Sequence, residues 1–431
     1  MKGSYFLVAG ALFASLVFNT SCSSTDDEGG NVNVNKQSQS DFKSFNLTEA
    51  QQAMVKSSNN FALKLMKVEN EEQAGRSFVV SPLSVSFLLG MINNGAQGTT
   101  QQEIVSALGF SDSNVEEANT YFQLLMNQAP EIDQKVNLSI ANMVYVNKAK
   151  GIEFSRDYCN TTKNYYKAGI ESMDFTKSSS LQTINSWCND HTNGAIPAIL
   201  TEQEFNEDAV SYLLNTIYFK APWAGSFNKE LTRKADFTRE DGTKYQVDMM
   251  SKTATVGHFV NNDLRAISLP YANGNYQMMV ILPGEENCTK VADVLAKLTP
   301  SYWKQLTTSI GRASQETDVY LPRFQSETKL ELNEPLKQLG VKKAFSTEAD
   351  FSKMLAGDSK VFLSKVLQKA LVEVTEDGTE AAAVTEGEMA VTADSNAGEK
   401  NVFRADRPFV YVIYEKTSNA IFFIGQFTGN E

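Results

Sequence analysis

The sequence predicts an α+β fold, because helical patterns occupy the first half of the chain and strand patterns the second half, without regular alternation. In the first half, apolar residues recur at helical spacing behind capping residues. From residue 211 onward, β-branched and aromatic runs lie between turn residues. Several of these runs are apolar almost throughout, which is typical of strands buried on both faces.

Three helices are expected in the N-terminal part. The first covers residues 48–68, where Met54, Phe61, Leu65 and Met66 fall at helical spacing. The second follows the dipeptide Ser81-Pro82, a capping hydroxyl before a proline suited to a first turn, and continues through the apolar run to Ile92. The third opens at residues 100–103, Thr-Gln-Gln-Glu, which have the form of a capping box.

Eight strands are expected from runs of β-branched and aromatic residues. They cover residues 138–146, 212–219, 245–250, 264–269, 276–282, 318–321, 409–414 and 420–425.

The N-terminus has the pattern of an export signal. Lys2 precedes an apolar run from Tyr5 to Phe18, which is shorter than the ~20 residues of a membrane span. A small residue directly before Cys22 resembles a bacterial lipoprotein signal, in which this cysteine becomes the lipidated N-terminus. We therefore expect a signal peptide over residues 1–21 and lipidation at Cys22; the alternative is an ordinary secretory signal beside an incidental cysteine.

A polar stretch rich in Asn, Gln and Ser follows over residues 22–45 and predicts a flexible tether. No second low-complexity linker follows it, so residues 46–431 are expected to form a single domain. The protein is expected at the outer membrane or cell surface, contacting the membrane only through its lipid; the alternative is a periplasmic or secreted protein.

The composition argues against several classes of function. The chain has 51 acidic against 39 basic residues, which argues against nucleic-acid binding. Two histidines allow no multi-histidine metal site, and we expect neither metal nor cofactor. The sequence has no Gly-x-Ser-x-Gly motif and no Gly-rich phosphate loop, so a hydrolytic enzyme is the least favoured class and no catalytic residue is assigned. An odd number of cysteines remains beyond Cys22, which gives no disulfide framework: Cys159, Cys188 and Cys288.

The most informative segment is residues 378–392. Its odd-numbered positions from Thr379 to Val391 carry no charge, whereas the even-numbered positions carry Glu380, Glu386 and Glu388. Side chains on a strand alternate between faces, so this segment is patterned to bury one face in a sheet. Turn residues on both flanks instead predict a loop. The combination suggests a segment with two states; an exposed helix or linker is the alternative.

Four stretches of the chain, in order and in register, resemble the serpins, a family of serine-protease inhibitors. The resemblance extends from about residue 45 to the C-terminus. The four stretches are Ser81-Pro82-Leu83-Ser84 to Thr100, Asn215 to Trp223 with Phe227, Gln368 to Val374 leading through Glu376-Asp377-Gly378-Thr379, and Ala405 to Phe409 with Phe422 to Gly425.

The resemblance implies three β-sheets, about eight or nine helices and an exposed reactive-centre loop. Several residues match the family's functional positions one by one. Ser81, Ser84, Asn215 and Gln368 resemble its polar sheet-opening cluster, in which the family usually has His where this chain has Gln368. Trp223 and Glu376 resemble residues at the top of the sheet, with Arg323 as the expected partner of Glu376. The loop hinge would comprise Glu376, Gly378, Thr379, Glu380, Ala381, Ala382, Ala383, Val384 and Thr385.

The resemblance also implies that a target protease cuts the loop and forms a covalent acyl complex with it. The family's usual spacing places the cut at Thr392-Ala393, after Val391 if shifted by one, or near Ala397-Gly398 when counted back from Pro408. No Lys, Arg or aromatic residue lies in residues 389–397, which favours an elastase-like or subtilisin-like protease over a trypsin-like one. A papain-like cysteine protease is a further alternative. We expect a monomeric inhibitor; a non-inhibitory serpin-like carrier is the second hypothesis.

Overall fold

The computed structural model describes residues 42–110, 115–284, 289–379 and 401–429. Nine α-helices lie within these ranges: α1 (Glu49–Glu72), α2 (Pro82–Asn93), α3 (Gly98–Leu108), α4 (Val115–Gln128), α5 (Arg156–Tyr166), α6 (Ser180–His191), α7 (Val291–Lys297), α8 (Pro300–Arg312) and α9 (Asn333–Gln338). The described residues form one compact unit.

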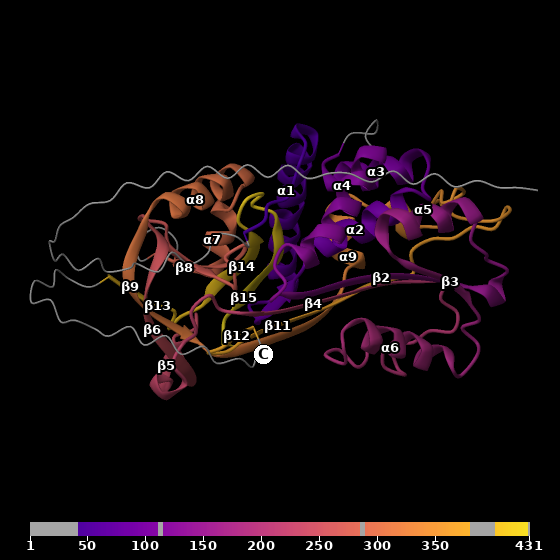
Figure 1. The fold of residues 1–431 in the computed structure, drawn as a ribbon. Helices are drawn as coiled ribbons and strands as arrows, with labels where there is room; N and C mark the ends of the chain where they lie inside the picture. Colours follow the sequence, from indigo (N-terminus) through magenta and orange to yellow (C-terminus); the bar gives the residue numbers. More distant parts are fainter. Residues whose placement is uncertain (1–41, 111–114, 285–288, 380–400, 430–431) are drawn as a thin grey trace, which may run out of the picture. The chain divides into compact units, whose positions relative to one another are not determined.

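The first hydrogen-bonded network is a six-stranded sheet. Its order is β10 (Phe324–Glu331), β11 (Lys365–Val374), β4 (Ser211–Pro222), β2 (Asn137–Asn147) and β3 (Gly169–Met173), and the short strand β12 (Gly378–Thr379) pairs with β4. Figure 1 shows this sheet between α6 on one side and α2, α4 and α5 on the other.

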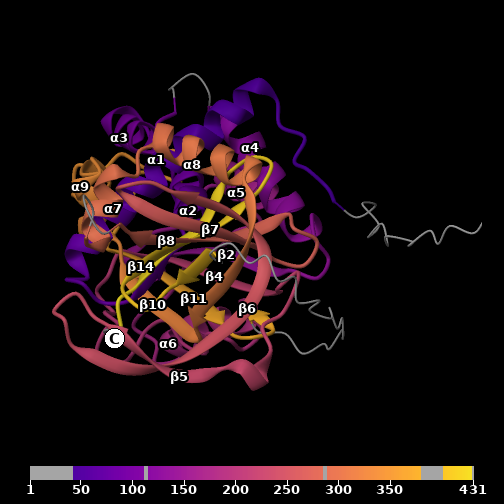
Figure 2. The same ribbon diagram turned by 90° about the vertical axis from the view of Figure 1, so that its left-hand side faces the viewer.

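The second network has nine strands. Figure 2 labels β5, β6, β7, β8 and β14 among them. Its order is β1 (Phe78–Val80), β15 (Ile421–Phe427), β14 (Phe409–Glu415), β8 (Tyr276–Pro283), β7 (Leu264–Pro270), β6 (Lys244–Val260), β9 (Ser314–Pro322) and β13 (Asn401–Arg404), with β5 (Arg233–Thr238) on β6. The 17-residue strand β6 pairs with β7 only near its C-terminal end and with β9 over its middle. It therefore joins two sheets, which with the six-stranded sheet make the three that the resemblance implied.

Strand alternation explains how the six-stranded sheet is covered on both faces. On β4, Leu213, Ile217 and Phe219 face the main core with the N-terminal helices. The intervening residues Tyr212, Leu214 and Tyr218 face a second core. That second core includes Ile184 and Cys188 of α6, so α6 closes the opposite face of the sheet.

Local signals set two of the three predicted helix starts. Thr48 caps α1 in a reciprocal capping box with Gln51, and the Ser81 side chain caps α2 with Pro82 in the first turn. The predicted capping box at residues 100–103 is wrong, because α3 begins at Gly98 after Gln97, without a side-chain cap. Thr100 and Glu103 instead accept backbone hydrogen bonds from Asp350, Lys342 and Lys343, far away in the sequence.

All eight predicted strands are confirmed, whereas β1, β3, β5, β10, β11 and β13 were missed. β10 shows why: its sequence Phe-Gln-Ser-Glu-Thr-Lys-Leu-Glu is mostly polar, and three of its eight side chains are buried. Among the described residues no helix is long and apolar enough to cross a bilayer, and no group of His, Cys, Asp and Glu could hold a metal. Cys159 and Cys188 are free thiols.

Candidate functional site

The candidate site is the line along which β4 and β11 pair, which we call the seam. The two strands run parallel, with Tyr212–Phe219 paired to Lys365–Val372. Beyond Phe219 the pairing changes, because Ala221 and Pro222 pair with Thr379 and Gly378 of β12. Val374 still pairs with Phe324 on its other side. The end of the seam next to Ala221 and Pro222, which we call the upper end, is therefore already occupied by two residues of β12.

A tight turn carries the chain from β11 into β12. The Thr375 backbone N–H donates to the Gly378 carbonyl (2.7 Å), and the Gly378 N–H donates back (3.2 Å). Gly378 has a φ of +135°, and a Cβ at this position would lie 2.3 Å from the Ala221 carbonyl oxygen. Only glycine fits both the backbone conformation and the close approach to β4.

Thr379, the second of the two residues of β12, is buried, with 1% of its surface exposed. Its hydroxyl lies 3.1 Å from the Tyr271 hydroxyl, within hydrogen-bond distance. The Tyr271 ring stacks on Trp223 with centroids 4.3 Å apart, and the Trp223 indole N–H donates to the Thr375 carbonyl (2.9 Å). Burial raises the pKa of Tyr271, so its hydroxyl stays protonated and available for this hydrogen bond.

Glu376 lies in the same turn, with 4% of its side chain exposed. Its carboxylate accepts a hydrogen bond from the Thr232 hydroxyl (2.7 Å), and Arg323 lies 3.7 Å away. Arg323 is closer to Asp248, at 2.8 Å, and is 47% exposed. Lys234 and Arg323 together hold the pKa of Asp248 below its usual value. The expected pair of Arg323 and Glu376 is thus present, but Arg323 is shared and the contact is long.

The predicted sheet-opening cluster lies at the middle of the seam, on the face of the sheet that packs against the main core. The Gln368 side-chain amide donates to the Asn215 side-chain oxygen (2.7 Å) and to the Ser81 carbonyl (3.0 Å), and its oxygen accepts from the Ser81 N–H (2.8 Å). Asn215 donates to the Ser84 hydroxyl and to the Asn142 side chain. Ser81, Ser84, Asn215 and Gln368 are all fully buried. Gln368 and Asn215 therefore join the two strands of the seam through an uncharged side-chain contact.

The remaining predicted site residues lie outside the described residues. They are Cys22, Glu380, Ala381, Ala382, Ala383, Val384, Thr385, Val391, Thr392, Ala393, Ala397 and Gly398.

Sequence reasoning missed three residues that contact the predicted site: Tyr271, Thr232 and Asn142. They lie 108, 144 and 73 positions from their partners, and no spacing pattern connects them. The available signal was a polar side chain inside a strongly apolar run, as at Asn142 within residues 138–146.

Comparison with known proteins identifies the family. A family profile described as serpin (serine protease inhibitor) matches residues 56–429. The chain belongs to the serpins. The leukocyte elastase inhibitor of Sus scrofa is 32% identical to this serpin over 372 residues, which cover 85% of this chain and 96% of that protein.

Solved serpin structures share the fold. The thermophilic serpin Tengpin in the native state is 29% identical and superposes with a TM-score of 0.78 over 89% of this chain and 95% of that one. The complex of thyroxine-binding globulin with thyroxine is 28% identical, with a TM-score of 0.77, and covers 88% of this chain and 100% of that one. The matching proteins thus include one named as a protease inhibitor and one named as a hormone-binding protein.

Proposed function

We propose that this serpin is a suicide-type protease inhibitor rather than an enzyme, and that its loop enters the seam as a new strand after cleavage. The observation that carries the proposal is the register of β12. Thr379 already pairs with Ala221, so each further step along the loop would pair with one residue back along β4. Six steps from Thr379 bring Thr385 beside Asn215, which in the present sheet is paired with Gln368.

This register matches the chemistry of the loop to the chemistry of the seam. Thr385 is a polar residue on the uncharged face of the loop, and in this register it would reach the sheet-opening cluster. Its hydroxyl could then form hydrogen bonds with the side-chain amides of Asn215 and Gln368 once the two strands have separated. Ala381 and Ala383 would lie beside Phe219 and Ile217 of the main core, where small apolar side chains fit. A buried charge there would cost several kcal/mol.

Two of the three glutamates on the charged face of the loop also meet suitable partners, whereas Glu386 would lie between Leu214 and Leu367 of the second core. Glu388 would lie between Tyr212 and Lys365, and Glu380 beside Lys220. Both glutamates would face the side of α6, where lysines of β4 and β11 are within reach of a neighbouring strand. Exposed pairs of glutamate and lysine contribute about 1 kcal/mol or less each. They would therefore help to select this register but add little to the stability of the inserted strand.

The mechanism follows from protease chemistry. The protease serine attacks the carbonyl carbon of Thr392, the peptide bond to Ala393 breaks, and the new amine of Ala393 takes the proton from the protease histidine. The released loop then inserts and carries the acylated protease along. Fourteen residue steps from Gly378 to Thr392 span roughly 48 Å at ~3.4 Å each. The strained geometry stops deacylation, because shifts of about 1 Å at a catalytic centre cost ~10²-fold in rate.

The target we propose is an elastase-like or subtilisin-like serine protease, with a papain-like cysteine protease as the alternative. Residues 389–397 offer no basic side chain to a trypsin-like pocket, and Val391 or Thr392 suits a shallow aliphatic one. The relative from Sus scrofa, named as an elastase inhibitor, supports this choice.

The proposal is tested by incubating the protein with pancreatic elastase and with trypsin. We expect a covalent complex that survives SDS with elastase, and mass spectrometry of the released fragment identifies the cut bond. A stable complex with trypsin alone would contradict the proposed target class, and cleavage without any complex would contradict inhibition.

The second candidate is a carrier, because thyroxine-binding globulin shares the fold. The melting temperature before and after a single cut in the loop separates the two functions. An inhibitor becomes much more stable when its loop inserts, whereas a protein whose loop stays out does not. The uncharged alternate positions of residues 379–391 favour the inhibitor.

We also place the protein outside the cytoplasm, anchored through Cys22 at the outer membrane or cell surface and acting on proteases there as a monomer. The support is the sequence of residues 1–22. Cys22→Ala should move the protein from the membrane fraction to the soluble fraction; equal distribution of both proteins would contradict the anchor.

A further inference from the structure

The opposite end of the seam, which we call the lower end, is closed by hydrogen bonds that involve the side chains of Ser211 and Ser364. The Ser364 hydroxyl, just before β11, accepts from the backbone N–H groups of Val210 (3.0 Å) and Ser211 (3.4 Å). The Ser211 hydroxyl, at the start of β4, donates to the Phe362 carbonyl (2.9 Å) and accepts from the Ser364 N–H (3.3 Å). We call this reciprocal set the clasp. It joins the two strands that must separate if a strand is to enter between them.

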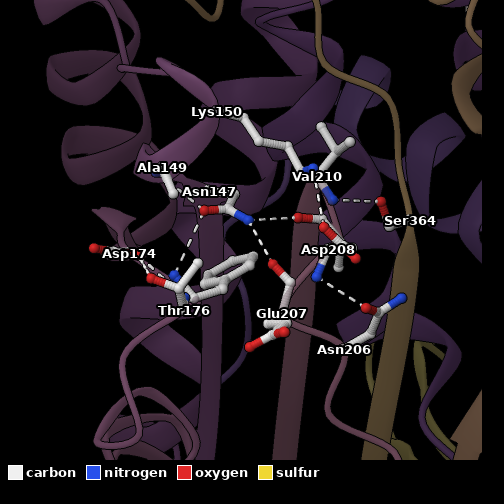
Figure 3. Close-up of polar contacts among 12 residues, drawn as sticks. Asn147, Ala149, Lys150, Asp174, Thr176, Asn206, Glu207, Asp208, Val210 and Ser364 are labelled. Carbon is white, nitrogen blue, oxygen red and sulfur yellow. Dashed lines mark hydrogen bonds and ion pairs between the residues drawn. The ribbon is translucent and has the colours of Figure 1, made fainter.

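The β4 side of the clasp is held in place by Asn147 at the end of β2 (Figure 3). The Asn147 side-chain amide donates to the carbonyls of Glu207 (2.9 Å) and Ala209 (3.0 Å), and its oxygen accepts from the Ala149 N–H (3.1 Å). Its backbone N–H donates to the Val210 carbonyl. With 1% of its surface exposed, Asn147 fixes the chain that enters β4 to β2. When the seam opens, the clasp contacts to Ser364 and Phe362 must therefore break.

The register of β12 predicts which loop residue reaches the clasp. Ten steps from Thr379 along the loop correspond to ten steps from Ala221 back to Ser211. On the other side of the seam, Ser364 is the next residue in register with Ser211, because Lys365 pairs with Tyr212. Met389 would therefore arrive between the two serines, three residues before the proposed cut at Thr392.

A cavity of about 430 Å³ opens beside the clasp. Val210, Tyr212, Phe362 and Ser364 contribute to its lining, and Asn333 and Lys337 of α9 form part of its other wall. Chain that passes the clasp would therefore enter space that is not filled by side chains.

We propose that the clasp sets how far the loop inserts, and that Ser211 and Ser364 are positioning residues of the inhibitory reaction; this inference rests on the proposed function. With only the two residues of β12 in the seam, the clasp is intact. Insertion of Met389 and the residues after it requires the clasp to open. The last part of the movement, which carries the attached protease to the lower end of the sheet, thus depends on these hydrogen bonds breaking.

The first test replaces the clasp by a bond that cannot open. Neighbouring strands lie about 4.8 Å apart, within the ~4.4–6.8 Å between Cα atoms that a disulfide spans. We expect the oxidised double variant Ser211→Cys/Ser364→Cys to be cut by elastase and to release active protease. At least tenfold more inhibitor should then be consumed per protease inactivated, and dithiothreitol should restore the original ratio.

The control disulfide joins Gln325→Cys and Glu373→Cys, which are paired across β10 and β11 on one side of the seam. We expect it to leave the ratio unchanged in both redox states. Equal inhibition by the oxidised and reduced clasp variants would overturn the inference. Failure of the unmodified protein to form any complex would instead overturn the proposed function.

The second test needs no cross-link. Ser364→Ala removes the acceptor for two backbone N–H groups, so it should lower the melting temperature of the uncut protein by roughly 2–4 °C. It should leave the melting temperature of the cut protein unchanged, because the inserted strand has already broken the clasp.

The matched control is Ser155→Ala, which removes a cap of α5 whose hydroxyl binds Tyr158 and Lys353 and neither strand of the seam. We expect it to lower both melting temperatures equally. If Ser364→Ala also lowers both equally, the clasp persists after cleavage and the inference is wrong.

Discussion

Thr379→Arg tests whether the start of the loop must be buried for inhibition. Thr379 is 1% exposed, and its hydroxyl contacts Tyr271, whose ring is stacked on Trp223. Arg at this position would either bury an unpaired charge or push β12 out of the sheet. Removing a charge from water without a partner costs several kcal/mol. A cost of ~4 kcal/mol, if it falls on the insertion step, slows insertion by ~10³-fold relative to deacylation.

The assay is a titration of elastase with increasing amounts of the inhibitor. The parent should inactivate the protease at a ratio close to one, whereas Thr379→Arg should be consumed as a substrate with little covalent complex on SDS gels. Glu380→Arg is the matched control, since the same side chain then lies on the alternate, outward face of the loop and should cost about 1 kcal/mol or less. If Thr379→Arg inhibits as well as the parent, loop insertion is not how this protein acts.

Two further substitutions test stability. Burial raises the pKa of Glu69 on α1 from 4.5 to about 7. The folded state therefore holds the proton more tightly, and stability falls as pH rises from about 4.5 to 7. Glu69→Gln should stabilise the protein by up to about 3 kcal/mol at pH 8 and hardly at all at pH 4, as measured by urea unfolding; a gain that does not vary with pH would refute this. Thr216 has a buried hydroxyl without a hydrogen-bond partner among the described residues. Thr216→Val should therefore raise the free energy of unfolding by about 1 kcal/mol, and a loss of stability would show that the hydroxyl is satisfied.

The sequence predicted well where a local physical rule acts. The hydroxyls of Thr48 and Ser81 cap helices because a free backbone N–H lies within reach whatever the rest of the chain does. Apolar runs such as residues 212–219 and 276–282 became strands that are buried on both faces, whereas residues 245–250 and 318–321 alternate between buried and more exposed positions. Strand β10 was not predicted, because its sequence is mostly polar.

The same limit explains the error at α3. Thr100 and Glu103 have the spacing of a capping box, but their oxygens bind the backbone of residues about 240–250 positions away. Local spacing carries no information about such competing partners, so the structure alone decides between them.

For the candidate site, the sequence by itself determined which side chains are available. It gave the loop one uncharged face, gave the turn at Gly378 a residue without a Cβ, and supplied the four stretches that resemble the serpins. Only the tertiary structure decided how these parts meet. It paired Thr379 with Ala221, placed Tyr271 and Thr232 against the hinge, and closed the lower end of the seam with Ser211 and Ser364. The physical reason is that hydrogen bonds and strand register depend on the distance between atoms in space, and residues far apart in the chain become neighbours only when the sheet forms.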